Sequence, residues 1–303
     1  MSDIRFEERV VVITGAGNGL GRSHALEFAR RGAKVVVNDL GGSGFGEGSD
    51  HNAADAVVNE ISAAGGEAVA NYDSVTDGEK IIQTAMDTFG RVDVVINNAG
   101  ILRDKSFHKM SDEDWRLIFD VHVYGAFKVT QAAWPIMREL NFGRIIFTTS
   151  AAGIYGNFGQ ANYSAAKLAQ LGMGQTLAVE GRSKNILVNT IAPIAGSRLT
   201  ETVMSQKLLE QLKPEFVTPL VIKLCDEQST VTNGLFEVGA GFFAQLRWER
   251  SQGVFFDSTE PFEAEDVELK WRAITDFTDA THPQNISEAN KAIFSRIRRN
   301  KDD

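Results

Sequence analysis

Cysteine is almost absent from this sequence of 303 residues, since Cys225 is the only one. A single thiol cannot form an intrachain disulfide or supply a metal site made of several thiolates, so we expect a reducing compartment. Positive charge is also scarce, because 31 Lys and Arg stand against 40 Asp and Glu for a formal net charge of −9. A negative field repels nucleic acid and anionic membranes, so we expect neither as a partner.

Long hydrophobic runs are missing as well. No stretch approaches the roughly 20 apolar residues that span a bilayer. The start, "MSDIRFEERVVVITG", carries acids and only a short apolar run, which is unlike a secretory signal. The last residues, "RNKDD", match no targeting address. We therefore expect a soluble intracellular protein.

Short β-branched runs alternate with longer helical patterns along most of the chain. The runs are "RVVVITG", "KVVVND", "EAVANYD", "VDVVINNAG", "GRIIFTTS", "NILVNTIAP" and "LFEVGAG". Strands separated by helices are typical of a parallel sheet, and continuous apolar strands such as Val10–Ile13 are expected where helices cover both faces. The sequence predicts an α/β fold with a doubly wound, parallel, seven-stranded sheet of the Rossmann type.

The alternation stops after Gly241, which predicts two parts. We expect one Rossmann-type domain over residues 1–245 and a C-terminal extension over residues 246–303 that packs on the core or on a partner subunit. The extension is too rich in aromatic residues for a mobile tail, with Trp248, Phe255, Phe256, Phe262, Trp271 and Phe277. Its last segment predicts an amphipathic helix from the spacing of Ile286, Ala289, Ile293 and Ile297.

A glycine-rich turn follows the first strand in "VVVITGAGNGLGRSHALEFARRGAKVVVND". Gly15, Gly19 and Gly21 lie between strand and helix, and Asp39 ends the second strand. Glycines let the backbone approach a pyrophosphate, and the helix N-terminus favours its negative charge. Asp39 would accept hydrogen bonds from the adenosine ribose and repel a 2′-phosphate, which predicts NAD over NADP. The alternative to a dinucleotide site is a purely structural glycine turn with a helix-capping acid.

Four motifs occur in the order typical of one family: the Gly-x-x-x-Gly-x-Gly spacing, "YDSV", "NNAG" at Asn97–Gly100 and "NYSAAK". From about Arg9 to Gly241 the chain resembles the short-chain dehydrogenase/reductase family. The resemblance implies no metal and a set of contacts with NAD: Gly15, Asn18, Gly19, Leu20, Gly21, Asp39, Asp73, Ser74, Val75, Asn98, Ala99, Gly100, Tyr163, Lys167 and Pro193.

Tyr163 and Lys167 are four residues apart and therefore share a helix face, where the ammonium would lower the pKa of the phenol. Such a pair is common on ordinary helices, but Ser150 lies thirteen residues before the tyrosine, where the family keeps its substrate-binding serine. The resemblance implies that Tyr163 takes the hydroxyl proton, Ser150 holds the oxygen and Lys167 grips the nicotinamide ribose. The reaction would be reversible alcohol–ketone redox.

A histidine, His122, stands in "VHVYG" where most of the family has asparagine in "VNxxG". The resemblance implies a kinked helix whose backbone carbonyl at this residue holds a water against the catalytic lysine. The imidazole itself could shuttle protons, since its usual pKa is about 6.5. It could instead only pack and bond within the bend, which we favour because an interior histidine is more often a satisfied core residue.

Five further passages point to a narrower family: "VVVNDLGGSGFGEG", "NNAGILRDKSF", "GIYGNFGQANYSAAK", "NTIAPIAGSRLTETVM" and "GLFEVGAGFFAQLRWER". They resemble the (3R)-hydroxyacyl-CoA dehydrogenase unit of peroxisomal multifunctional beta-oxidation enzymes. No hydratase or sterol-carrier domain follows, so the chain would be a free-standing relative or one piece of a longer protein. Arg198 and Thr200 are candidates for phosphate or CoA contacts, or belong to a capped surface helix.

This resemblance implies NAD-dependent oxidation of (3R)-3-hydroxyacyl-CoA to 3-oxoacyl-CoA from fatty acids or sterol side chains. It also implies a homodimer or homotetramer, cytoplasmic if bacterial and peroxisomal if part of a eukaryotic enzyme. The alternatives are a hydroxysteroid dehydrogenase or 3-oxoacyl-thioester reductase and, from another class, a non-catalytic NAD-sensing protein. The intact set of Ser150, Tyr163 and Lys167 argues against a sensor.

Overall fold

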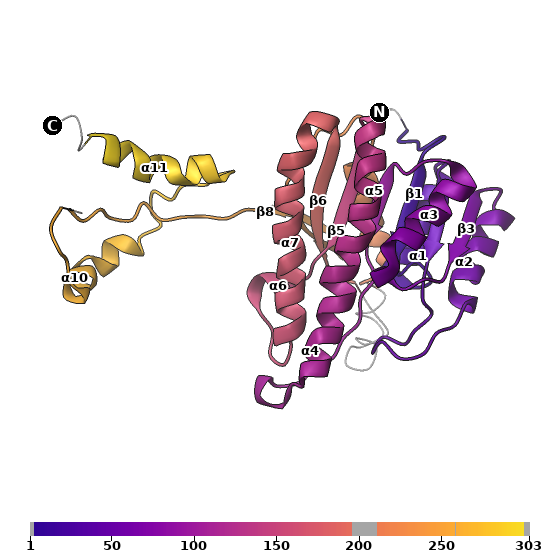
Figure 1. Cartoon of the computed structure of the whole chain (residues 1–303), viewed down its shortest axis with the longest axis horizontal. Helices are drawn as coiled ribbons and strands as arrows, with labels where there is room; N and C mark the ends of the chain where they lie inside the picture. Colours follow the sequence, from indigo (N-terminus) through magenta and orange to yellow (C-terminus); the bar gives the residue numbers. More distant parts are fainter. Residues whose placement is uncertain (1–2, 196–210, 258, 300–303) are drawn as a thin grey trace. The chain divides into compact units, whose positions relative to one another are not determined.

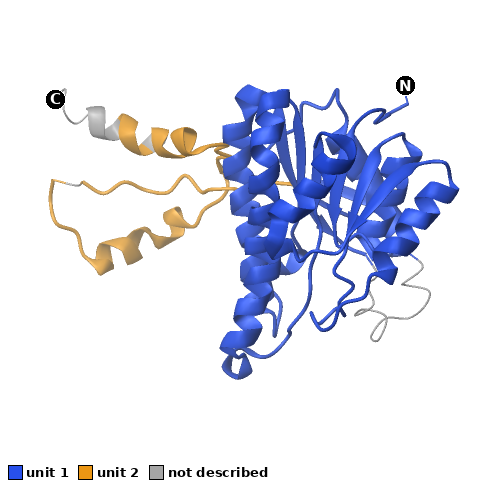
Figure 2. Ribbon diagram, turned by 45° about the vertical axis from the view of Figure 1, so that its right-hand side comes forward, with its two compact units in different colours: residues 1–245 blue, residues 246–303 orange. Residues whose placement is uncertain are grey.

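A computed structural model describes residues 3–195, 211–257 and 259–299 of the chain. The chain divides into two compact units, Met1–Gln245 and Leu246–Asp303 (Figure 2). The candidate cofactor and catalytic residues all belong to the first unit.

The first unit is built on a sheet whose strands follow the order β3-β2-β1-β4-β5-β6-β7-β8 (Figure 1). Neighbouring strands from β3 to β7 are parallel, and the central register pairs Val12 with Val36 on one side and Val95 on the other. The strands are β1 Val10–Thr14, β2 Lys34–Asn38, β3 Glu67–Asn71, β4 Val94–Asn97, β5 Gly143–Thr148, β6 Ile186–Pro193, β7 Leu235–Gly239 and β8 Phe242–Leu246. The predicted doubly wound α/β fold is confirmed.

The eighth strand corrects the predicted number of seven. Only Ala240 and Gly241 separate β7 from β8, and both have positive φ angles, 50° and 80°. Two positive φ angles in a two-residue connection are the geometry of a tight hairpin turn. β8 therefore continues the sheet beyond Gly241, where the alternation of strands and helices was expected to stop.

Helices cover both faces of the sheet, and successive strand residues point into two separate cores. Val11 and Ile13 pack with α1, α2 and α9, whereas Val10 and Val12 pack with α3, α5 and α7 (Figure 1). The helices of the first unit are α1 Gly19–Arg30, α2 Asn52–Ala63, α3 Gly78–Phe89, α4 Asp112–Phe119, α5 Ala126–Leu140, α6 Ala151–Tyr155, α7 Ala161–Gly181 and α9 Thr218–Cys225. Short helical turns are η1 Val75–Asp77, η2 Phe107–Lys109, the π-helix η3 Asp120–Gly125, η4 Arg182–Lys184 and η5 Pro214–Phe216.

The strand order reverses direction between β1 and β4. In doubly wound sheets a ligand crevice forms at this point, outside the carboxyl ends of the strands. Thr14 ends β1, Asn38 ends β2 and Asn97 ends β4. Ser150 follows two residues after the end of β5. Segments that lie far apart in the sequence therefore meet at one edge.

The second unit contains α10 Ala264–Ile274 and α11 Ile286–Arg299. A capping box joins Glu263 and Asp266 at the start of α10, and α11 confirms the predicted final helix. Aromatic side chains of this unit are largely exposed, with Trp248 at 55% and Trp271 at 54%. Packing of this unit on the core or on a partner stays a prediction. Throughout the described residues, no helix is both long and apolar enough to cross a membrane.

Candidate active site

The glycine turn between β1 and α1 has a shape that favours glycine at three positions. Gly15 and Gly19 have φ angles of 63° and 53°. A Cβ on Gly21 would lie 2.1 Å from the carbonyl oxygen of Gly15. The side-chain nitrogen of Asn98 donates to the carbonyls of Thr14 and Gly15, at 2.9 and 3.0 Å, and ties the turn to the end of β4.

The N-terminus of α1 fits a phosphate group. The side chain of its N-cap residue, Asn18, makes no capping hydrogen bond, and the first turn contains no acidic residue. The free N–H groups of the helix therefore face the crevice, together with the positive end of its dipole. No acidic side chain in the first turn neutralises this positive end. Leu20 belongs to the same turn. This arrangement is what a dinucleotide pyrophosphate requires.

Asp39 is held firmly beside the turn. One carboxylate oxygen accepts from the backbone nitrogen of Gly17 at 2.7 Å, and the other accepts from Gly41 at 2.8 Å. Each oxygen keeps a lone pair, so the carboxylate can still accept from a ribose hydroxyl. A Cβ on Gly17 would lie 2.8 Å from the same carboxylate, which explains a further glycine in the motif.

Polar contacts at the end of β3 order the predicted NAD contacts Asp73, Ser74 and Val75. The side chain of Asn38 donates to the carbonyl of Asp73 at 2.9 Å, and that of Asn71 donates to the Asp73 carboxylate at 2.8 Å. Ser74 accepts from the backbone of Thr76 at 3.3 Å. These contacts present Asp73 to Val75 as one ordered turn at the sheet edge.

The "NNAG" segment is fixed by Thr14, a residue that the sequence motifs did not indicate. Its hydroxyl oxygen accepts from the backbone nitrogens of Asn98 and Ala99, both at 3.1 Å. A Cβ on Gly100 would lie 2.6 Å from Cε1 of His122, so the glycine leaves room for the imidazole. A hydroxyl residue directly before the glycine turn was the available signal for Thr14.

Ser150 and Tyr163 are carried by two helices that pack together. Ser150 is the N-cap of α6, and Tyr163 lies in the first turn of α7. Burial raises the pKa of Tyr163, a side-chain hydrogen bond with Ser150 opposes that rise, and the charge of Asp104 adds to it. The Tyr163 phenol is therefore protonated at neutral pH.

Lys167 corrects one expectation. Its Nζ donates to the carbonyl of Thr148 at 2.7 Å and lies 5.5 Å from the centre of the Tyr163 ring. Burial lowers the pKa of Lys167 to about 7. We expected this ammonium to lower the pKa of Tyr163, and that expectation is wrong in this structure. Burial desolvates both groups, and this effect outweighs the charge effect expected from their spacing on the helix.

His122 lies in the π-helix η3, so the helix is irregular at the residue for which a kink was expected. The side chain is 1% exposed, and its Nε2 is 2.9 Å from the oxygen and 3.1 Å from the nitrogen of Ile101. Its ring stands edge-on to that of Tyr163 with centres 5.3 Å apart. Burial, aided by the charge of Lys167, lowers the pKa of His122 well below its usual value. A neutral imidazole favours the structural role.

Two buried amide side chains that the motifs did not assign also hold α7 in place. Asn162 donates to the carbonyls of Arg103 at 3.2 Å and Asp114 at 3.3 Å, and accepts from the Tyr163 nitrogen at 2.8 Å. Gln170 donates to the backbone carbonyl of His122 at 2.6 Å. The only signal for either residue was its place on the helix that carries Tyr163.

The predicted site residues follow the carboxyl ends of β1 to β6 or lie on the elements packed against them, with Pro193 closing β6. Arg198 and Thr200 lie outside the described residues. Within the described ranges no cluster of three or more His, Cys, Asp or Glu residues could hold a metal ion.

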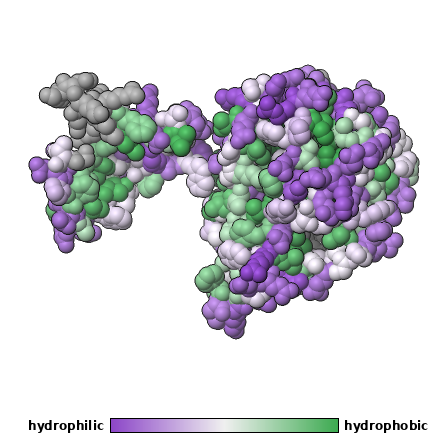
Figure 3. Space-filling view, viewed as in Figure 1, coloured by the Kyte–Doolittle hydropathy of each residue, from purple (hydrophilic) through white to green (hydrophobic). Residues whose placement is uncertain are grey.

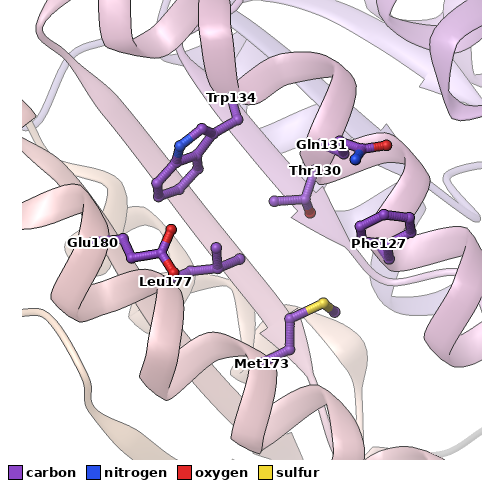
Figure 4. A pocket seen from close by; sticks show the side chains of 7 residues that line it. All are labelled: Phe127, Thr130, Gln131, Trp134, Met173, Leu177 and Glu180. Atoms are coloured by element: carbon purple, nitrogen blue, oxygen red, sulfur yellow. The ribbon is translucent and has the colours of Figure 1, made fainter.

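A groove of about 200 Å³, whose lining does not include Ser150, Tyr163 or Lys167, lies between α5 and α7 (Figure 4). Its walls come from both helices: Phe127, Thr130, Gln131, Trp134, Met173, Leu177 and Glu180. Phe127, Trp134, Met173 and Leu177 give the groove mainly apolar walls, to which Thr130, Gln131 and Glu180 add polar groups.

Comparison with known proteins gives one family and several close relatives. A family model described as short chain dehydrogenase matches residues 9–213. Peroxisomal multifunctional enzyme type 2 of Mus musculus is 59% identical over 293 residues, which are 96% of this chain and 40% of that protein. The structure of full-length peroxisomal multifunctional enzyme type 2 from Drosophila melanogaster matches with a TM-score of 0.84 at 43% identity, over 98% of this chain and 50% of that one.

A third similarity includes a cofactor. The structure of a 7α-hydroxysteroid dehydrogenase complexed with NADH and 7-oxo glycochenodeoxycholic acid matches with a TM-score of 0.71 at 28% identity, over 80% of this chain and 98% of that one. The chain thus spans half or less of the two multifunctional enzymes, whereas nearly all of the hydroxysteroid dehydrogenase's length is matched.

Proposed function

Because the chain belongs to the short-chain dehydrogenase family, we propose that it is an NAD-dependent dehydrogenase of (3R)-3-hydroxyacyl-CoA thioesters. Its product would be the 3-oxoacyl-CoA of fatty-acid or sterol side-chain beta-oxidation. The observation that carries the proposal is the position of Ser150 and Tyr163, which follow β5 on two helices that pack together at the sheet edge that also presents the glycine turn. Similarity to peroxisomal multifunctional enzymes supports the substrate class.

A nicotinamide cofactor is characteristic of the family, and the geometry of Asp39 supports NAD in particular. The carboxylate is held by Gly17 and Gly41 at the position where the adenosine ribose would lie. A 2′-phosphate there would meet a fixed negative charge and displace the ribose hydroxyl that could donate to it. When bound, the nicotinamide ring supplies the hydride acceptor.

The side chains of the site divide the remaining chemistry between them. Ser150 would hold the substrate oxygen by a hydrogen bond, and Tyr163 would exchange the proton. Because the Tyr163 pKa is raised, its phenol is ready to donate a proton to a developing alkoxide. In the oxidative direction the phenolate is needed, so the oxidation rate should rise toward alkaline pH. Lys167 would bind the nicotinamide ribose.

Assembly as a homodimer or homotetramer forms part of the proposal. Apolar side chains gather over α7, beside the groove shared with α5 (Figures 3 and 4). Val179 is 68% exposed and Leu168 is 41% exposed on this helix, and Phe127 of α5 is 38% exposed. Contiguous apolar surface of this kind is typical of protein interfaces. A second copy placed on this face would cover it.

Localisation follows the same reasoning from relatives. A eukaryotic source would place the chain in the peroxisome as part of a multifunctional enzyme, and a bacterial source would place it in the cytoplasm. The acyl-CoA thioester would be its small-molecule partner.

A substrate screen tests the proposed activity. Purified protein is supplied with (3R)- and (3S)-3-hydroxyacyl-CoA of several chain lengths, a hydroxysteroid and either NAD or NADP, and reduced cofactor is followed by absorbance. We expect turnover of the (3R) thioesters with NAD, and none after Ser150→Ala.

Each other outcome of the screen identifies an alternative. Oxidation of the steroid with inert thioesters would establish a hydroxysteroid dehydrogenase. NAD binding by calorimetry without turnover of any substrate would favour a sensor. Equal kcat/KM with NADP would contradict the role given to Asp39.

A further inference from the structure

Gln170 is a buried polar residue whose position on α7 is not explained by packing. It is 1% exposed and lies three residues beyond Lys167, so the two side chains share the inner face of the helix. An apolar residue would fill the same space without the cost of desolvating an amide. The amide oxygen of Gln170 has no partner among the described residues, which makes the choice of glutamine still more costly.

The amide nitrogen of Gln170 has a specific partner. It donates to the backbone carbonyl of His122 at 2.6 Å. A carbonyl oxygen can only accept, so the amide must be oriented with its nitrogen toward His122. This carbonyl lies in the π-helix η3, where the regular pattern of α-helical hydrogen bonds is interrupted. The glutamine thus satisfies a buried acceptor within the irregular turn.

The turn is held on three sides. Gln170 contacts the His122 carbonyl, and the His122 ring contacts the backbone of Ile101. On the third side, Gly125 packs so closely on Val75 that a Cβ on the glycine would lie 2.4 Å from the Val75 side chain. These contacts fix the imidazole edge-on against the Tyr163 ring, at 5.3 Å between centres.

We infer that Gln170 is a positioning residue for this site. Its amide locks the π-turn η3 to α7 through the His122 backbone carbonyl and thereby fixes that turn against the helix that carries Tyr163 and Lys167. The catalytic part of this inference rests on the proposed function, and its structural part does not. Because a displacement of about 1 Å can cost roughly a hundredfold in rate, loss of this one donor should lower kcat.

Two substitutions separate the hydrogen bond from packing. Gln170→Met keeps the length of the side chain and removes the donor. Gln170→Glu keeps the shape and donates only while its carboxyl is protonated, a state that burial extends toward neutral pH. Gln175→Met, on the same helix but partly exposed, is the matched control.

We expect Gln170→Met to lower kcat by about tenfold to a hundredfold with little change in the KM for NAD. Gln170→Glu should retain activity at the acidic end of its pH profile and lose it as the carboxyl ionises, and Gln175→Met should match the unmodified protein. Equal loss in both Gln170 variants at every pH would show that the donor is not the cause and would overturn the inference.

A spectroscopic measurement tests the structural part without substrate. In protein labelled with ¹⁵N-histidine, the ring signals of His122 are assigned by their loss in His122→Asn. They should shift in Gln170→Met and stay in place in Gln175→Met, whether or not any thioester is turned over. Unchanged His122 signals in Gln170→Met would refute the inference. If that variant does not fold, the pH dependence of the same signals in Gln170→Glu decides.

Discussion

The buried amine of Lys167 should make the stability of the protein depend on pH in a direction opposite to that of a surface lysine in an ion pair. Burial lowers its pKa from 10.5 to about 7 in the folded chain. Between these values the unfolded chain binds a proton that the folded chain does not. The free energy of unfolding therefore rises with pH over this range.

The magnitude follows from the two pKa values. A proton bound by only one state changes the free energy of unfolding by about 1.4 kcal/mol per pH unit. The folded lysine is half protonated near pH 7, which reduces the first part of that slope. Raising the pH from 7 to 9 should thus stabilise the fold by about 2 kcal/mol through Lys167 alone.

Lys167→Met removes the titrating group while keeping a long apolar stem. Urea unfolding at pH 7, 8 and 9, followed by tryptophan fluorescence, gives the free energy of unfolding for both proteins. The unmodified chain should gain stability relative to Lys167→Met as the pH rises. Lys80→Met is the control, because it removes a lysine whose side chain is 65% exposed. Parallel pH curves for the unmodified chain and Lys167→Met would refute the assignment of a lowered pKa.

Three further changes test the site. Tyr163→Phe should abolish turnover, since it removes the hydroxyl that carries the proton. Cofactor binding, measured by calorimetry, and thermal stability should stay nearly unchanged. Normal turnover would remove Tyr163 from the mechanism. His122→Asn should retain most of kcat with an unmoved pH–rate profile, because a neutral buried imidazole does not carry the proton. A large loss of kcat with a shifted acidic limb of that profile would show that the imidazole does carry it. Gly21→Ala should weaken NAD binding at least tenfold, because its Cβ would approach the Gly15 carbonyl to 2.1 Å; calorimetry with unaltered affinity would contradict the close packing of the turn.

The sequence by itself determined the periodic part of this protein. Apolar runs of strand length between helical patterns require a parallel sheet covered on both faces, and seven such strands are present in that arrangement. Gly15, Gly19 and Gly21 were identifiable because their spacing reflects two positive φ angles, which side chains disfavour, and a close backbone approach at Gly21. Tyr163 and Ser150 were identifiable from a family motif. All of these signals are local in the chain.

The tertiary structure alone decided the properties that depend on residues distant in the sequence. Burial by the surrounding elements sets the pKa of Tyr163 and Lys167, and this desolvation reverses what their spacing of four residues suggested. The bond from Gln170 to the His122 carbonyl joins residues 48 positions apart, so no motif contains it. Hydrogen-bond partners and desolvation are properties of three-dimensional neighbours, and a linear pattern carries neither.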